Sequence, residues 1–136
     1  MTCTFFGHAD APDSIRAQLF QIIVSLINEG VSTFYVGNHG CFDRIVTAEL
    51  LRAKQQYPHI TCLSVLAYLP TQNDSKLETI FPEDIATAPP RFRISRRNQF
   101  MLKKSDVVVA YIRRQTGGAA KFVLDAERRN LRVIYL

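Results

Sequence analysis

Five short apolar runs, rich in β-branched and aromatic residues, alternate along the chain with segments of helical periodicity. The runs are residues 2–6, 32–36, 61–69, 106–112 and 132–136. None of them alternates apolar with polar residues, so we expect both faces of each strand to be covered. This pattern is typical of a parallel sheet with helices packed on both sides.

Apolar residues at helical spacing predict helices over residues 13–29, 41–57, 94–105 and 117–130. Gly30 is expected to end the first of them. With right-handed crossovers, these elements form an α/β fold of the Rossmann-like type. We predict a three-layer, doubly wound parallel sheet of five strands in the order 3-2-1-4-5.

Residues 70–94 interrupt the alternation with four prolines, and Pro70 is expected to end the third strand. In the predicted order, this segment carries the chain from the edge strand to the far side of the first strand. The winding therefore reverses between the first and fourth strands, where ligands bind outside the carboxyl ends. Three turns are expected to meet there: Gly7-His8, Gly37–Gly40 and Arg113–Gly118.

Gly117 and Gly118 open the last predicted helix, and no acidic side chain follows in its first turn. Glycines let the backbone approach a ligand closely, and N–H groups at the positive end of a helix dipole attract anions. The pair is therefore a candidate phosphate site, although glycines also serve the geometry of turns. Thr116 is expected to cap the helix, the alternative being a hydrogen bond to a phosphate oxygen.

The turn at residues 37–43 is a second candidate for ligand contact. Gly37 and Gly40 allow a tight turn against a ligand, and Asn38 offers both a donor and an acceptor. Asp43 falls in the first turn of the second predicted helix, where the helix dipole alone explains it. A ribose hydroxyl is the alternative partner for its carboxylate.

Few residue types suited to catalysis stand together in the sequence. His8 lies at the end of the first strand, where it either satisfies a backbone group or acts as a base or hydrogen-bonding group. No nucleophile beside a base and no pair of carboxylates is evident, so His8 and Asp43 are the only catalytic candidates. No histidine or cysteine spacing resembles a metal site, and we expect neither a metal nor a cofactor.

Positive charge is concentrated in the last third of the chain. Residues 91–136 hold twelve Lys/Arg and three Asp/Glu, whereas the net charge of the whole chain is +5. This distribution suits a phosphate-bearing ligand or single-stranded nucleic acid as a partner, or a solvated basic surface.

The segment 91–101 combines four arginines with two phenylalanines, a composition that could bind single-stranded nucleic acid. On a helix, three apolar residues can form the buried side: Ile94, Phe100 and Met101. Arg96, Arg97 and Asn98 then lie near the N-terminal end of the helix. The arginines would either clamp a phosphate or face solvent.

The remaining composition points to an ordinary globular protein. No apolar run approaches the roughly 20 residues that span a bilayer, and the N-terminus lacks the basic region of a signal peptide. Cys3, Cys41 and Cys62 are widely spaced and odd in number, which argues against a disulfide framework. We expect one cytoplasmic domain over residues 1–136, without a membrane partner. Its apolar edge strands would permit a homodimer.

Three segments carry a resemblance to known proteins: FFGH, YVGNHGCFDRIVTAELLRAKQQYP and ISRRNQFMLKKSDVVVAYIRRQTGGAAKFVLDAERRNLRVIYL. They are similar to the SLOG superfamily. This is the group around the lysine-decarboxylase-like cytokinin-activating (LOG) proteins, the single-strand DNA-loading protein of natural transformation and the bacterial YpsA-like (DUF1273-like) proteins of unknown function. The YpsA-like branch looks most similar. The resemblance implies a Rossmann-like fold with strand order 3-2-1-4-5 and a pocket for a nucleotide or nucleotide-derived ligand.

In the cytokinin-activating relatives, an Arg four residues before a Met precedes the motif PGGxGTxxE. Arg97 and Met101 match the first pair, and Gly117 and Gly118 match the two leading glycines. The departures are Thr116 for the proline, Ala120 for the third glycine, Lys121 for the threonine and Leu124 for the glutamate. Those enzymes depend on the glutamate to cleave an N-glycosidic bond. The resemblance thus implies phosphate-binding glycines without the catalytic acid of those enzymes.

The sequence therefore predicts a sensor- or carrier-type protein that binds a nucleotide-derived small molecule. Two alternatives stay open: an enzyme acting on an N-glycosidic bond, such as a nucleotide phosphoribohydrolase or a deoxyribosyltransferase-like protein, and a single-stranded nucleic-acid-binding protein. The enzyme would need a carboxylate from elsewhere, such as Asp43. The predicted nucleotide-binding residues are Gly7, His8, Gly37, Asn38, Gly40, Asp43, Arg97, Asn98, Thr116, Gly117 and Gly118.

Overall fold

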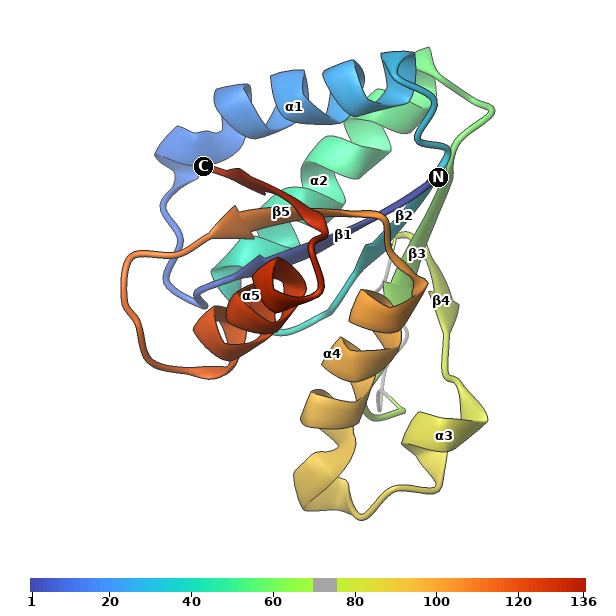
Figure 1. Cartoon of the computed structure of the whole chain (residues 1–136). Helices are drawn as coiled ribbons and strands as arrows, with labels where there is room; N and C mark the ends of the chain where they lie inside the picture. The colour runs from blue at the N-terminus through green and yellow to red at the C-terminus, as the bar shows by residue number, and fades with distance from the viewer. Residues whose placement is uncertain (70–75) are drawn as a thin grey trace.

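The computed structural model describes residues 1–69 and 76–136, and its strands form one parallel sheet in the order β4-β3-β2-β1-β5-β6 (Figure 1). The strands are β1 (Thr2–Gly7), β2 (Thr33–Val36), β3 (Thr61–Val65), β4 (Glu78–Ile80), β5 (Val107–Tyr111) and β6 (Arg132–Tyr135). All five predicted strands form, and they lie in the predicted order relative to one another. The prediction of five strands is wrong, because the sheet has six.

The additional strand, β4, lies within the proline-bearing segment 70–94 and pairs with β3 at the edge of the sheet. It has only three residues, and none of them is fully buried. A segment so short and so exposed lacks the apolar run that marks the other strands, which is why the sequence pattern misses it. The predicted role of Pro70 lies outside the described residues, and β3 itself already ends at Val65.

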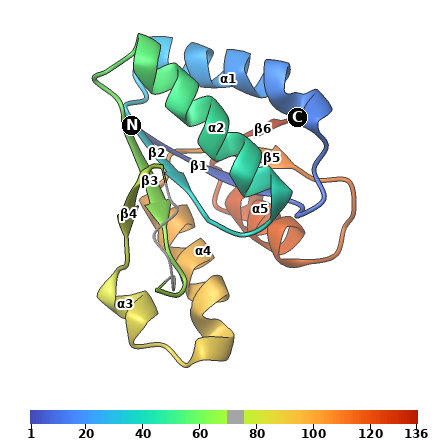
Figure 2. The ribbon, with the colours of Figure 1, turned by 180° about the vertical axis from the view of Figure 1, so that it is seen from behind.

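Helices cover both faces of the sheet, as predicted. On one face lie α1 (Arg16–Asn28) and α2 (Gly40–Gln56), and on the other α4 (Arg93–Lys104) and α5 (Gly118–Arg128) (Figures 1 and 2). A short helix α3 (Glu83–Ala86) and two 3-10 turns, Asp13–Ile15 and Pro90–Phe92, complete the described elements. No helix in the described parts of the chain combines the length and apolarity that crossing a membrane requires.

Each face of the sheet has its own hydrophobic core, and β1 contributes to both. Phe5 packs on the α1/α2 side, where its ring lies 6.2 Å from that of Phe34. The next residue, Phe6, packs on the α4/α5 side, with its ring 5.8 Å from that of Phe122. Successive strand residues point to opposite faces. Because both faces are buried, most of the strand is apolar, and the buried hydroxyl of Thr4 donates to the Tyr35 carbonyl at 3.2 Å.

The pairing of β1 with β5 determines where the winding of the sheet reverses. The two strands run parallel in register from Cys3 opposite Val107 to Gly7 opposite Tyr111. The expectation that the first and fourth predicted strands are neighbours is therefore confirmed. Their carboxyl ends open at the same edge of the sheet, where the winding reverses.

The buried side of α4 differs from the predicted one. Met101 is buried as expected, but Ile94 is 39% exposed. Arg97 and Asn98 are buried instead, with exposed fractions of 5% and 8%. The apolar pattern fails here because this part of α4 faces the turn after β2, whose polar groups can pair with a buried guanidinium.

Candidate functional site

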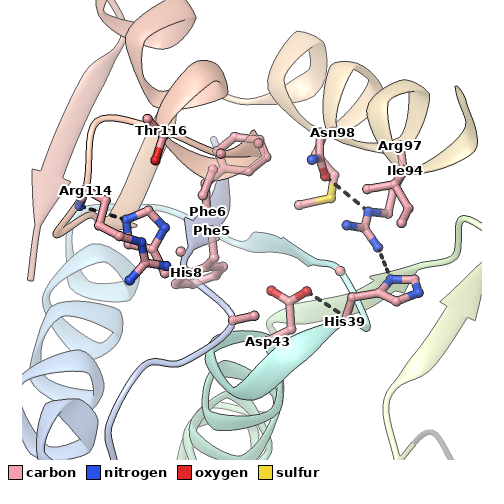
Figure 3. A pocket seen from close by; sticks show the side chains of 17 residues that line it. Phe5, Phe6, His8, His39, Asp43, Ile94, Arg97, Asn98, Arg114 and Thr116 are labelled. Carbon is pink, nitrogen blue, oxygen red and sulfur yellow. Dashed lines mark hydrogen bonds between the residues drawn. The ribbon is translucent and has the colours of Figure 1, made fainter.

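A cavity of about 360 Å³ lies at the carboxyl ends of β1 and β5 (Figure 3). Nine of the eleven predicted site residues line it: Gly7, His8, Gly37, Asp43, Arg97, Asn98, Thr116, Gly117 and Gly118. The other two, Asn38 and Gly40, line a neighbouring cavity of about 730 Å³. The fold thus brings all three predicted turns to one place.

The start of α5 forms one side of the cavity. Gly117 precedes the helix with φ +96°, a left-handed conformation that strongly favours glycine. The first turn of α5 holds no acidic residue, and no side chain caps it. Lys121 N–H donates to the Gly117 carbonyl at 3.2 Å, so the N–H groups of residues 118–120 come before the first intrahelical bond. This end of the helix can therefore donate hydrogen bonds to an anion.

The predicted cap by Thr116 is wrong. Thr116 is exposed and lies one residue before the N-cap position, which Gly117 occupies. A capping side chain belongs to the N-cap residue itself, from which it accepts a backbone N–H of the first helical turn. Thr116 lies one position before the N-cap residue, so its side chain does not cap α5. Its hydroxyl lines the cavity, near Phe6 and away from Arg97 in Figure 3.

The glycines around the cavity differ in what surrounds them. A Cβ at Gly7 would lie 2.4 Å from the Phe42 ring, and a Cβ at Gly40, whose φ is +87°, would lie 2.7 Å from the Ala9 Cβ. Packing therefore explains these two glycines without a ligand. At Gly117 and Gly118, by contrast, a Cβ would meet nothing within 4 Å. Of the glycines that line this cavity, only Gly117 and Gly118 have open space beside the backbone where a side chain would stand.

Arg97 crosses the cavity wall and ties α4 to the turn after β2. Its Nε donates to Asn98 Oδ1 at 3.2 Å, and its Nη1 donates to Asn38 Oδ1 at 3.3 Å. Nη1 also lies 2.8 Å from His39 Nδ1, which must be the acceptor because a guanidinium has no lone pair to offer. Burial lowers the pKa of Arg97, while Asp43 opposes that shift. Burial and the Arg97 charge also lower the pKa of His39.

Asp43 is the buried carboxylate of the cavity. Its Oδ2 accepts the backbone N–H of His39 at 3.0 Å. This bond gives a partner to the N–H group of the residue that precedes α2. Burial raises the pKa of Asp43 to about 6, with Arg97 and the His39 N–H acting in the opposite direction. Both Asp43 and Arg97 approach Gly37, where a Cβ would lie 2.7 Å from Asp43 Oδ2 and 2.9 Å from Arg97 Cζ. The absence of a side chain at Gly37 thus leaves room for the Asp43 carboxyl group and the Arg97 guanidinium in the same wall of the cavity.

His8 joins the ends of β1 and β5 on the opposite side of the cavity. Its Nε2 accepts the Arg114 backbone N–H at 3.1 Å, and its own backbone N–H donates to the Tyr111 carbonyl at 3.2 Å. The neutral ring then carries its proton on Nδ1. The contact matches the interpretation that His8 satisfies a backbone group. Arg114 pairs with the exposed Asp10 at 3.1 Å.

Sequence reasoning did not assign several residues to the site. Five apolar ones carried no signal, because their types are those of any core: Phe5, Phe6, Ala9, Ile94 and Ala119. Met101 also lines the cavity, and its only signal was the match to the Arg–Met pair of the cytokinin-activating proteins. His39 and Arg114 could have been found, since both lie in turns that the topology brings together. Leu124, at the position of the family's glutamate, is 47% exposed and lines a groove between α4 and α5 rather than this cavity.

Replacing Asp43 with Asn is expected to remove a pH dependence of folding. The folded pKa of about 6 lies above the ordinary 3.8, so the folded state holds this proton more tightly. That contribution is present at low pH, and it is lost as the pH rises from about 4 to about 6, by up to about 3 kcal/mol. Urea denaturation of wild type and Asp43→Asn at several values across this interval measures it.

The exposed Asp84 provides the matched control, since Asp84→Asn makes the same substitution outside the cavity. The Asp84 variant should keep the pH dependence of the wild type. Equal pH slopes of the unfolding free energy in wild type and Asp43→Asn would show that Asp43 does not titrate as its burial implies.

Comparison with known proteins identifies the fold. No family model matches the chain, and no curated protein matches its sequence. Among solved structures, DNA processing protein A from Helicobacter pylori, described for its single-stranded DNA binding mode, superposes with a TM-score of 0.70 at 13% identity. DNA processing protein A from Streptococcus pneumoniae superposes with a TM-score of 0.73, also at 13% identity.

Both superpositions use nearly all of this chain, 99% and 98%, but only 64% and 49% of the neighbours' chains. The chain therefore spans about half to two thirds of the length of those proteins. At 13% identity, the likeness shows a common fold, and it agrees with the fold that the SLOG resemblance implies. The chain has the Rossmann-like fold of DNA processing protein A.

Proposed function

We propose that this protein binds the phosphate group of a nucleotide or nucleotide-derived ligand in the cavity between the ends of β1 and β5. The observation that supports the proposal best is the diglycine corner. Gly117 holds a positive φ, Gly118 opens α5 without an acidic or capping side chain, and free space lies in front of both. We also propose that the chain belongs to the SLOG superfamily, with the YpsA-like branch resting on the sequence resemblance alone.

The remaining cavity residues have complementary roles in this proposal. The N–H groups at the start of α5 donate to the phosphate. Arg97 holds the turn after β2 in place through Asn38 and His39, and its charge adds to the positive potential. The volume of about 360 Å³ lies at the small end of ligand pockets, which run from about 300 to 1,000 Å³. The cavity therefore suits a single nucleotide unit, with its sugar toward residues 37–43.

Binding is favoured over a reaction because the ionisable groups of the cavity already have partners. Asp43 accepts the His39 N–H, and His8 Nε2 accepts the Arg114 N–H. A reaction at an N-glycosidic bond would have to use Asp43 Oδ1, because Oδ2 accepts the His39 N–H. Incubation with nucleoside monophosphates, followed by chromatography for the free base, tests that alternative directly.

Single-stranded nucleic acid is the second candidate ligand. Two observations favour it: a fold neighbour is described for binding single-stranded DNA, and residues 91–136 carry most of the positive charge. A phosphodiester would present the same charged oxygens to the diglycine corner as a free nucleotide. The two candidates therefore share the chemistry of the cavity.

Isothermal titration calorimetry with a matched panel tests the proposal. The panel holds nucleoside monophosphates, cyclic nucleotides, ADP-ribose and the corresponding nucleosides without phosphate. We expect heat of binding from at least one phosphate-bearing compound and none from its nucleoside. Equal binding of the nucleoside, or silence across the panel with a folded sample, would refute phosphate recognition.

A further inference from the structure

A basic groove of about 410 Å³ runs between α4 and α5, outside the cavity described above. Four exposed cations line it: Lys103, Lys121, Arg128 and Arg129. One carboxylate, Asp125, also lines the groove and pairs with Arg129 at 3.2 Å. Within residues 1–69 and 76–136, no carboxylate lies within ion-pairing distance of the other three cations. Among the described residues, the groove therefore presents three cations without an ion-pair partner.

The cations continue from the diglycine corner along α5. Lys121 follows Gly118 by one helical turn, and Arg128 follows Lys121 by seven residues, so both lie on the same side of the helix. From Gly118 to Arg128 the helix extends about 15 Å. On α4, Lys103 lies further along the same helix that brings Arg97 to the cavity. A chain of anions leaving the cavity along α5 would meet these charges in succession.

The groove suits a polyanion better than it suits a second copy of this chain or a single nucleotide. A second copy of this chain, related by a two-fold axis, would bring the same three cations against themselves, which is unfavourable. A single nucleotide has its phosphate within the cavity and would leave the groove empty. Leu124 lies between the cations, 47% exposed, and offers apolar surface to a sugar or base. A single strand can place phosphates along the cations and its bases on such surface.

We propose that the α4/α5 groove is a second phosphate-binding surface, and that it extends the cavity into a track for single-stranded nucleic acid. This inference rests on the proposed function, because the first phosphate of the strand occupies the diglycine corner. It names the ligand as an oligonucleotide rather than a free nucleotide. Successive phosphates of that strand contact Lys121 and Arg128.

The test compares two variants that each lose two positive charges. Lys121→Gln/Arg128→Gln removes cations of the groove. Arg16→Gln/Arg132→Gln removes a partly buried and an exposed cation on the α1 side of the sheet, each of which has an acidic partner. Fluorescence anisotropy measures the affinity of each protein for a labelled eight-residue oligothymidylate and for a thymidine dinucleotide, at several salt concentrations.

For the groove variant we expect oligonucleotide affinity about tenfold lower at low salt, and a log–log salt slope smaller by about 1.4, since each single-strand phosphate contact contributes about 0.7. The dinucleotide should bind this variant within about twofold of wild type. The control variant should keep oligonucleotide affinity within about twofold of wild type. Thermal melting of all three proteins verifies that they are folded.

Each other outcome overturns a specific statement. If oligonucleotide affinity falls equally in both variants, or does not fall in the groove variant, the groove proposal is overturned. The cavity proposal would remain supported as long as the dinucleotide binds. No binding of either compound by wild type would overturn both. Oligonucleotide binding that depends on the groove but is unchanged by Gly118→Asp would overturn both the cavity proposal and the continuous track, and it would leave the groove as a separate phosphate-binding surface.

Discussion

Gly118→Asp is expected to lower the affinity for phosphate-bearing ligands by about 100-fold or more while the protein stays folded. The substituted carboxylate would lie at the first position of α5, among the N–H groups proposed to receive the phosphate. Two negative charges a few ångströms apart repel strongly near a protein surface, by about 4 kcal/mol at 4 Å. Calorimetry with the tightest compound of the panel measures the loss.

The same change should leave the free energy of unfolding equal or slightly higher. Nothing lies within 4 Å of a Cβ at Gly118, and its φ is not positive. An acidic residue in the first turn of a helix is favourable by about 0.3–1 kcal/mol. A loss of binding with a gain of stability separates a site residue from a merely structural one.

Gly118→Asn is the matched control, because asparagine has the size of aspartate without its charge. We expect it to lose much less affinity than Gly118→Asp. If the two variants lose equal affinity, bulk rather than charge blocks the ligand, and recognition of an anion at this corner is contradicted. If neither loses affinity, the ligand binds elsewhere.

Gly7→Ala is expected to lower the free energy of unfolding by about 2–3 kcal/mol. The added methyl group would lie 2.4–2.6 Å from three atoms of the Phe42 ring. That ring is fully buried and stacks on Tyr111, with 6.3 Å between ring centroids, so it can move away only by displacing its packed neighbours. Overpacking of a dense core typically costs about 1–3 kcal/mol. Urea denaturation followed by circular dichroism measures the loss.

The control for this prediction is Gly118→Ala, the same chemical change at a position with open space. It should alter stability by no more than about 1 kcal/mol. Gly7→Ala combined with Phe42→Leu should lose less stability than the two single changes added together, because the smaller side chain relieves the contact. If Gly7→Ala is as stable as the wild type, the packing explanation is wrong.

These two predictions assign different physical roles to glycines that the sequence presents alike. Gly7 ends β1 and Gly118 opens α5, and both line the cavity. The structure separates them by what lies beside the missing side chain: a buried aromatic ring in one case and open space in the other. Only open space leaves room for a ligand to approach the backbone.

The sequence by itself determined the parallel sheet, the order of its five longer strands and the edge where their turns meet. A buried parallel strand must be apolar at nearly every position, so β1 and β5 are visible as apolar runs. Right-handed crossovers then leave few ways to connect them. The neighbouring positions of Gly7, Gly37 and Gly118 follow from this topology rather than from any local motif.

Only the tertiary structure decided which polar groups are buried and which strand lies at the edge. Arg97 and Asn98 occupy positions of α4 that an apolar pattern would leave to solvent, and they are buried because Asn38 and His39 of a distant turn pair with the guanidinium. Strand β4 exists because β3 offers it backbone hydrogen bonds, not because Glu78–Ile80 is apolar. Such contacts join residues far apart in the chain, and hydrophobic periodicity reports only on neighbours within one element.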